Sequence, residues 1–298
     1  MASYFQMGFY MLKSMLFGTK YPIGISIDVT YKCNLRCKHC YFLTQNYTDE
    51  LNDVALLTRL NEIKRKYPTI IHASWVGGEP LLRKSLVEKG MKLFPFNMIV
   101  TNGTIELPNW KNCVFNVSVD GTKQYYEQIR GKGFYDLVKK NANRKDIKVN
   151  VACVLNKKNY HCIEDMLKEW KETSVGGVVF DFYTPIKTIK EDLWLNWEER
   201  DNIIRKLFFL KKKYGNFLLN PKPVLDLMLS KNSKNITKNC LLPKAVVCLD
   251  SMGNQKLPCV IGQKADCSKC GCIIPFFVES VIVRKQVKSL YSTKKGFT

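Results

Sequence analysis

Acidic residues are scarce in this 298-residue sequence, which has 26 aspartate and glutamate residues against 47 lysine and arginine residues. The resulting formal charge of +21 creates a positive field that attracts nucleic acid, anionic lipid or phosphorylated substrates. A surplus of solvated lysines gives the same charge, so the field by itself identifies no partner. Apolar residues are plentiful enough for a real core, and the length suits one large α/β domain with a small appended module.

The N-terminus lacks the features of an exported or membrane-spanning chain. Residues 4–17 are apolar, but Lys13 interrupts them and no small-x-small cleavage site follows. The stretch is also shorter than the roughly 20 apolar residues that span a bilayer. We therefore expect a cytoplasmic, reducing setting, in which the clustered cysteines among the twelve are metal ligands rather than disulfides.

Six strand-like runs alternate with helical stretches in the first two thirds of the sequence. The strands are predicted at 23–29, 70–76, 96–100, 113–119, 147–155 and 178–183, and the later helices at 82–93, 122–143 and 159–173. This alternation predicts an α/β fold with a parallel sheet built from βαβ units. Polar residues follow five of the strands, at an edge where such folds gather their sites: Cys33–Cys40, Gly77–Pro80, Thr101–Gly103, Asp120–Gly121 and Thr184–Pro185.

Beyond residue 190 the pattern changes. A helix is predicted at about 196–213, a short helix follows Pro221 and Pro223, and a polar stretch occupies 230–235. Six cysteines then crowd into residues 240–272, the C-terminal cysteine segment, which has the composition of a small module held together by metal. The expected division is an amphipathic segment at 1–20, the α/β domain at 21–190, a helical connector at 191–239, and a metal-binding module with a basic tail at 240–298.

The most specific motif is the first cysteine loop, residues 33–40, in which Cys33, Cys37 and Cys40 are spaced C-x3-C-x2-C directly after a strand. Three thiolates this close can hold three irons of a [4Fe–4S] cubane and leave the fourth iron open to another ligand. An iron without a protein ligand indicates a catalytic cluster that binds another molecule, rather than a cluster without a catalytic role. A zinc knuckle or three buried thiols would be the alternative, but zinc usually takes four ligands.

With this loop and its strand context, residues 23–185 resemble the radical S-adenosylmethionine superfamily, whose fold is a partial (β/α)6 TIM-type barrel. The resemblance implies that the amino and carboxylate groups of S-adenosylmethionine chelate the open iron. It also implies that an external electron donor of the ferredoxin or flavodoxin type drives reductive cleavage to a 5′-deoxyadenosyl radical. His39 occupies the position where the superfamily places an aromatic residue near the adenine, although a packing or surface role is the alternative.

Further cofactor contacts are implied at the ends of the next strands. Gly77, Gly78, Glu79 and Pro80 match the GGEP loop that binds the methionine ammonium; glycines allow close backbone approach and a carboxylate complements an amine. By the same resemblance Asn102, Ser118 and Asp120 contact the ribose and carboxylate. Turn formation competes as an explanation for Asn102-Gly103 and Asp120-Gly121. No GxIxGxxE-like segment lies at the fifth strand, which leaves adenine contacts there unassigned.

The C-terminal cysteine segment resembles the auxiliary-cluster modules called SPASM or twitch domains. The resemblance implies a second [4Fe–4S] cluster on Cys240, Cys259, Cys267 and Cys270, with Cys248 or Cys272 as substitutes. The pattern departs from the family because five residues, not four, separate Gly253 from Cys259, and too few cysteines follow for two full clusters. Structural zinc is the alternative, since the spacing of Cys267 and Cys270 suits it equally well.

The layout also resembles, more distantly, the radical enzymes that transfer an adenosyl group to hopanoid lipids, through the GGEP loop, residues 223–227 and the late cysteines. This favours a lipid or other small substrate. Residues 4–17 and a basic tail would suit a peripheral membrane site, the tail being Arg284, Lys285, Lys288, Lys294 and Lys295. Peptide modification is the main rival, and nucleic acid is disfavoured because no RNA-binding module is visible. A non-catalytic iron–sulfur or zinc protein is the hypothesis of another class.

Overall fold

The computed structural model describes residues 21–45, 48–187 and 192–286. The amphipathic segment expected at 1–20, and Lys288, Lys294 and Lys295 of the expected basic tail, lie outside these ranges. No helix within the described ranges has the length and apolar composition needed to cross a bilayer.

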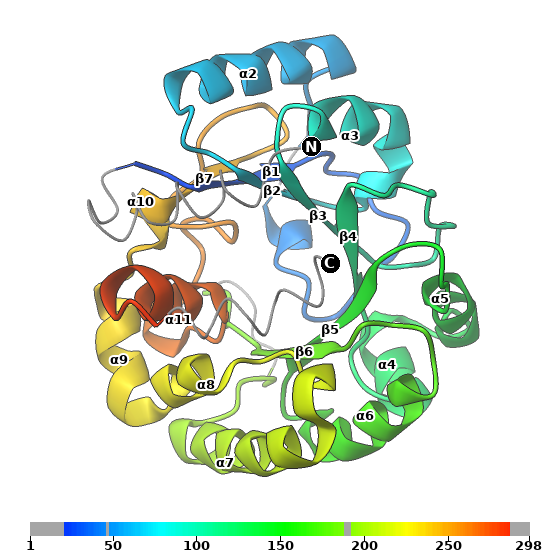
Figure 1. The fold of residues 1–298 in the computed structure, drawn as a ribbon, viewed down its shortest axis with the longest axis vertical. Coiled ribbons are helices and arrows are strands. Elements are labelled where there is room, and N and C mark those ends of the chain that lie inside the picture. Colours follow the sequence, from blue (N-terminus) through cyan, green and yellow to red (C-terminus); the bar gives the residue numbers. More distant parts are fainter. Residues whose placement is uncertain (1–20, 46–47, 188–191, 287–298) are drawn as a thin grey trace.

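Seven parallel strands form one sheet in the order β6-β5-β4-β3-β2-β1-β7, and the sheet curves into a partial barrel with its helices outside (Figure 1). The strands are β1 (Gly24–Asp28), β2 (His72–Val76), β3 (Phe96–Thr101), β4 (Cys113–Ser118), β5 (Val149–Leu155), β6 (Val178–Phe182) and β7 (Val246–Leu249). The predicted α/β barrel fold is confirmed, and its first six strands lie where the sequence places them.

β7 is a strand that the sequence analysis did not predict. It lies inside the C-terminal cysteine segment and pairs with the free edge of β1, where Ser26 stands opposite Cys248. The described part of the chain therefore leaves β6 and β7 as the two edges of the sheet.

The helices agree broadly with the predicted stretches. They are α2 (Asp53–Lys66), α3 (Lys84–Met91), α4 (Lys123–Arg130), α5 (Tyr135–Ala142), α6 (Ile163–Lys171), α7 (Trp197–Tyr214), α8 (Lys222–Met228), α9 (Ser230–Lys238), α10 (Leu242–Ala245) and α11 (Ile274–Val278). The single stretch expected at 122–143 is two helices, because Gly131 and Gly133 adopt φ values of +112° and +85° that end the first one. The polar stretch at 230–235 lies within α9.

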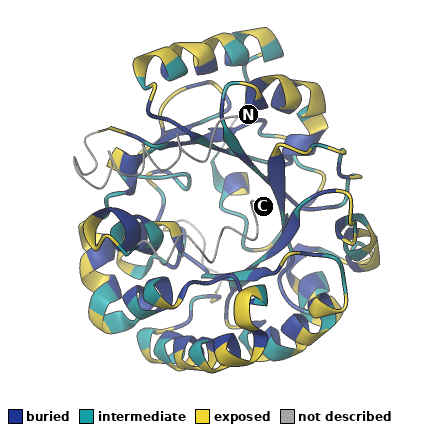
Figure 2. Ribbon diagram, viewed as in Figure 1, coloured by how far each residue is buried: buried dark blue, intermediate teal, exposed yellow. Residues whose placement is uncertain are grey.

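Alternation along the strands separates the core from the barrel interior. Residues such as Ile25, Trp75 and Phe180 are fully buried between the sheet and the helices, whose outer faces are exposed (Figure 2). Their alternating neighbours, including Ser74, Met98 and several others on β2 to β6, are only partly buried and face the opposite side of the sheet. Burial of each large apolar side chain stabilises the fold by about 1.5–3 kcal/mol and so fixes the strand ends in place.

Candidate active site

The first cysteine loop leaves β1 and carries three free, partly buried thiols. Two of the sulfurs receive N–H groups: the Leu35 amide lies 3.5 Å from Cys33 Sγ, and Arg130 Nη1 lies 3.9 Å from Cys37 Sγ. The Cys40 amide donates to the Cys37 carbonyl at 3.1 Å, which forms a tight turn between the last two thiols. Burial raises the pKa of Cys37 to about 11, and the nearby Arg130 guanidinium acts against that rise.

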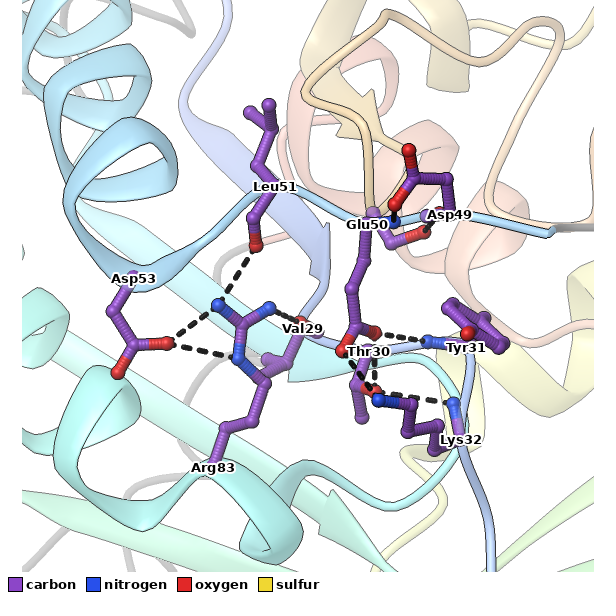
Figure 3. Close-up of polar contacts among 10 residues, drawn as sticks. Val29, Thr30, Tyr31, Lys32, Asp49, Glu50, Leu51, Asp53 and Arg83 are labelled. Atoms are coloured by element: carbon purple, nitrogen blue, oxygen red, sulfur yellow. Dashed lines mark hydrogen bonds and ion pairs between the residues drawn. The ribbon is translucent and has the colours of Figure 1, made fainter.

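Glu50 fixes the start of the first cysteine loop, as Figure 3 shows. The Thr30 hydroxyl donates to Glu50 Oε2 at 2.6 Å, and the Tyr31 amide donates to the same oxygen at 3.2 Å. Lys32 Nζ lies 3.5 Å from the other carboxylate oxygen. The three residues that directly precede Cys33 are therefore held by one carboxylate.

Arg83 holds the same region from the side of β2 (Figure 3). Its guanidinium donates to the carbonyls of Val29 at 2.7 Å and Leu51 at 2.9 Å, and it pairs with the Asp53 carboxylate at the start of α2. One planar fork thus joins three segments, which a lysine could not do with the same geometry.

The two glycines of the GGEP loop lie against the backbone that leads into the first cysteine loop. The amides of Gly78 and Glu79 donate to the carbonyls of Thr30 and Lys32, at 2.8 and 2.9 Å. A Cβ atom on Gly78 would lie 2.0 Å from the Lys32 carbonyl oxygen, and Gly77 has a φ of +116°. Only glycine permits this approach to the protein's own backbone, whereas the approach to a methionine ammonium that the sequence analysis expected stays a prediction.

Glu79 itself is turned into the protein. Its carboxylate accepts hydrogen bonds from the Thr101 hydroxyl and the Asn102 amide, each at 2.8 Å, and from the Leu81 amide at 3.0 Å. The side chain is fully buried; burial raises its pKa, and the three hydrogen bonds act against that rise. The carboxylate therefore joins the ends of β2 and β3 before the short 3-10 turn that Pro80 begins.

Asn102 joins the end of β3 to the first cysteine loop. Its Nδ2 donates to Asn34 Oδ1 at 2.8 Å and lies 3.8 Å from Cys33 Sγ. Its Oδ1 accepts from the backbone amide of Thr104 at 2.9 Å. Ser118, the last residue of β4, lies on the partly buried face of that strand.

Asp120 carries the largest electrostatic cluster of the site. Its Oδ2 accepts from Arg130 Nε at 2.6 Å and from His39 Nε2 at 2.8 Å, and its Oδ1 accepts from the Val154 amide at 2.8 Å. Burial raises the pKa of Asp120, but Arg130 and His39 outweigh that effect and hold it below its ordinary value. Because Arg130 also reaches Cys37, the cluster ties the ends of β4 and α4 to the first cysteine loop.

Four of the five predicted polar loops therefore contact one another at one end of the barrel. The fifth contributes differently: the Thr184 hydroxyl accepts from the Gly271 amide at 2.9 Å, next to the thiol of Cys270. The sequence analysis missed Arg130, Glu50 and Arg83, because no motif distinguishes them from the many other charged residues.

The C-terminal cysteines gather around Cys259, whose thiol interacts electrostatically with those of Cys240, Cys267 and Cys270. The sulfurs of Cys240, Cys259 and Cys270 each receive a backbone amide from two residues further on, as Cys33 does. The Cys270 amide donates to the Cys267 carbonyl at 3.3 Å, repeating the turn between Cys37 and Cys40.

The two substitute ligands share part of this arrangement: both thiols interact electrostatically with that of Cys259, and Cys272 also receives the backbone amide of Ile274. Cys248 is buried on β7, and Cys272 interacts with the Asp181 carboxyl, whose pKa burial raises to about 7.

Arg200 of α7 holds the turn between Cys267 and Cys270. Its guanidinium, 2% exposed, donates to the carbonyls of Cys270 at 2.8 Å, Tyr183 at 2.9 Å and Lys269 at 3.0 Å. Burial lowers its pKa to about 10. The rings of Phe182, Trp194 and Trp197 surround the cation, with centroids 5.1–5.6 Å away.

The donor sets suit iron–sulfur clusters. Among residues 21–45, 48–187 and 192–286, no three histidine, cysteine, aspartate or glutamate side chains are placed to hold one metal ion together. A [4Fe–4S] cluster makes a different demand, because each thiolate binds its own iron. Thiols in one loop that receive N–H groups fit this demand, since such hydrogen bonds stabilise ligating sulfur.

Comparison with known proteins shows which proteins this chain is similar to. Residues 27–169 match the Radical SAM superfamily. The Fe-coproporphyrin III synthase of Methanosarcina barkeri is 30% identical over 167 residues, which cover 48% of this chain and 40% of that protein. The sporulation killing factor maturation protein SkfB of Bacillus subtilis is 25% identical over 178 residues, 53% of this chain and 42% of that protein. The matched region is thus about two fifths of the length of these relatives.

A solved structure shares the fold. The Streptococcus suis protein SuiB, bound to its precursor peptide SuiA, superposes with a TM-score of 0.64 at 13% identity, covering 95% of this chain and 71% of SuiB. Residues 27–169 are thus similar to the Radical SAM superfamily, and the likeness to SuiB concerns the fold.

Proposed function

We propose that this chain binds a [4Fe–4S] cluster through Cys33, Cys37 and Cys40 and cleaves S-adenosylmethionine reductively. The observation that carries the proposal is the first cysteine loop: it has three thiols, two of which receive N–H groups, and the chain's own polar groups hold it to the ends of β2, β3 and β4. When bound, the cluster supplies the electron that cleaves the sulfonium to methionine and a 5′-deoxyadenosyl radical. The electron comes from an external donor of the ferredoxin or flavodoxin type.

The GGEP loop would bind the methionine ammonium through its backbone. Both carboxylate oxygens of Glu79 already accept from the protein's own donors, so the charge that the sequence analysis assigned to the ammonium is used inside the fold. Gly77 and Gly78 hold the loop against the backbone of Thr30 and Lys32, where there is no room for a side chain.

His39 is the residue of the Asp120 cluster with an atom left for the cofactor. Its Nε2 faces Asp120 at 2.8 Å, whereas its buried Nδ1 has no hydrogen-bond partner among the described residues. With Nε2 donating to the carboxylate, a neutral His39 presents Nδ1 as an acceptor, which suits the amino group of an adenine. Asn102 and Ser118 would contact the ribose and carboxylate, as the resemblance implies.

The test is replacement of Cys33, Cys37 and Cys40 together with alanine in anaerobically reconstituted protein. Reduced wild-type protein releases 5′-deoxyadenosine from S-adenosylmethionine, and the triple variant releases none. A matched control removes three buried thiols from the barrel elements, Cys113, Cys153 and Cys162, which are outside the proposed cluster sites. Release of deoxyadenosine by the first variant at the wild-type level would contradict the proposal, and no release by wild-type protein would favour a non-catalytic iron–sulfur or zinc protein.

A second [4Fe–4S] cluster on Cys240, Cys259, Cys267 and Cys270 is part of the proposal. The electrostatic coupling of these thiols around Cys259 and the amides aimed at three of them support it. Metal analysis tests it: two cubanes give about eight irons per chain. About four irons with zinc in the remainder would show that the C-terminal cysteine segment holds zinc instead.

We further propose a peptide as the substrate. SkfB is named as a maturation protein, and it is 25% identical to this chain over 178 residues. The lipid substrate favoured by the sequence analysis is the rival, and residues 4–17, part of the membrane site expected with it, lie outside the described residues. The discriminating measurement is which of short peptides, lipid extract or tRNA raises deoxyadenosine release; stimulation by lipid alone would replace the peptide proposal.

Peripheral membrane contact belongs to that rival. Arg284 and Lys285 lie at the end of the described region, and the other cations of the basic tail lie beyond it. Flotation with liposomes that contain anionic lipid, at low salt, tests the contact. Absence of binding to these liposomes at low salt would contradict the peripheral membrane contact.

A further inference from the structure

The C-terminal cysteine segment bridges the two edges of the sheet. Beside β7, Leu249 pairs with Gln255. Further along the chain, Ala265 pairs with Ile186, and the Phe182 amide at the end of β6 donates to the Gly271 carbonyl at 3.0 Å. The stretch that carries Cys259 is therefore held at both ends of the gap between β7 and β6.

Lys256 fastens this stretch to the end of β1. Its side chain is 6% exposed, and its ammonium forms an ion pair with Asp28 Oδ2 and donates to the Val260 carbonyl at 2.7 Å. Asp28 is the last residue of β1 and is fully buried. The Lys256 amide also donates to the Cys248 carbonyl on β7 at 2.7 Å, so both ends of this lysine are anchored.

The same stretch touches the residues that follow Cys40. Gln45 Nε2 donates to the Ile261 carbonyl at 2.7 Å, and Lys264 Nζ donates to the Thr44 carbonyl. Lys256 Nζ lies 5.9 Å from the ring centroid of Phe42, which is 4% exposed. Residues 41–45 and 256–264 therefore pack as neighbours, although more than 200 positions separate them in the chain.

We propose that Lys256 is a positioning residue that holds the loop bearing Cys259 against the segment after Cys40, so that the two cysteine sets form one rigid unit. A buried ion pair adds little net stability compared with apolar residues of the same volume, because desolvation offsets its attraction. Its advantage here is geometric, since the ammonium joins a strand end, a loop carbonyl and an aromatic ring at one point. This role of Lys256 matters only if the two cysteine sets bind metal as proposed. Its test does not depend on catalytic activity.

The test is amide hydrogen exchange on purified protein of the full chain, comparing wild type with Lys256→Met. The diagnostic amides are those of Thr44 and Gln45, which close the turn after Cys40, and that of Gly262, which bonds to the Cys259 carbonyl. We expect exchange at both places to accelerate at least tenfold in the variant. Lys269→Met is the matched control, because Lys269 lies in the same cysteine segment and is half exposed, and it should change neither.

Faster amide exchange near Gly262 alone would overturn the proposal, because the two segments would then move independently. Unchanged exchange at both places would overturn it as well. The double variant Asp28→Asn/Lys256→Met removes both charges. It replaces the single variant in the exchange experiment if that variant does not fold. It should regain the unfolding midpoint while Thr44 and Gln45 still exchange fast. Wild-type exchange in the double variant would show that Lys256 serves only to neutralise Asp28. Failure of the radical proposal would appear instead as missing deoxyadenosine in wild-type protein.

Discussion

Replacing Asp120 with asparagine should destabilise the protein strongly, because the change breaks a buried charge cluster. The carboxylate accepts from Arg130, His39 and the Val154 amide at 2.6–2.8 Å. Asparagine can still accept from Val154, but it leaves the Arg130 guanidinium, 9% exposed, without a negative partner. Removing one member of a buried pair costs about 3–5 kcal/mol. That is a large share of the roughly 5–15 kcal/mol that holds a domain folded.

Urea unfolding of metal-free protein at pH 7 measures this cost, and the slope with urea should stay constant if the variant keeps the native fold. Asp136→Asn is the control: Asp136 pairs with Lys123 on the surface, and its loss should change little. The Asp120 variant should also bind less iron in the first cysteine loop, because Arg130 no longer has a fixed position beside Cys37.

The pH dependence gives a second test of the same reasoning. The pKa of Asp120 is held below its ordinary value, so its contribution to stability is complete above the unfolded pKa of about 4 and is lost as pH falls through the lower folded value. The difference between wild type and Asp120→Asn should therefore be constant from pH 7 to about 5. A difference below about 1 kcal/mol, or one that disappears near pH 6, would refute the assignment of Asp120 as the charged centre of the cluster.

Three further predictions concern other parts of the site. Gly78→Ala places a Cβ 2.0 Å from the Lys32 carbonyl oxygen and should cost on the order of 3 kcal/mol in urea unfolding, with loss of iron from the first cysteine loop. Arg200→Lys loses the fork to three carbonyls and should cost about 3 kcal/mol and lower the metal content of the C-terminal cysteine segment, read by metal analysis. Burial lowers the pKa of His72 to about 4, so wild-type stability should fall by about 2 kcal/mol as pH drops from 6.5 to 4, and His72→Gln should flatten that slope.

The strands and the first cysteine loop could be predicted because their causes are local. Alternation in β1 to β6 follows from burial of one face, and the spacing of Cys33, Cys37 and Cys40 is written in a single loop. β7 escaped notice because it has four residues and no clear alternation. Its place is set by pairing with β1, which is a long-range effect.

The charged residues that organise the site were missed for a related reason. Lys256 meets Asp28 across 228 positions, and Arg200 meets the Cys270 carbonyl across 70. Sequence periodicity shows which face of an element is buried, but not which of 47 cations reaches a particular carboxylate. The role expected for Glu79 stays a prediction, but its residue type suggested only an ammonium partner and gave no sign of the three donors that the protein itself supplies.

Glu79 and Asp120 together indicate how the site is preorganised. Both carboxylates are fully buried, and each accepts three hydrogen bonds from the protein at a strand end beside the first cysteine loop. These carboxylates therefore hold the loops in place before any ligand binds. The entropy cost of ordering the loops is then part of folding and does not weaken ligand binding. Under the proposed function, recognition of the cofactor would then fall to the backbone of the GGEP loop and to His39 Nδ1, which has no hydrogen-bond partner among the described residues. It follows that Glu79→Gln, which keeps two of the acceptor interactions, should weaken the fold more than it weakens the affinity of the remaining folded protein for S-adenosylmethionine.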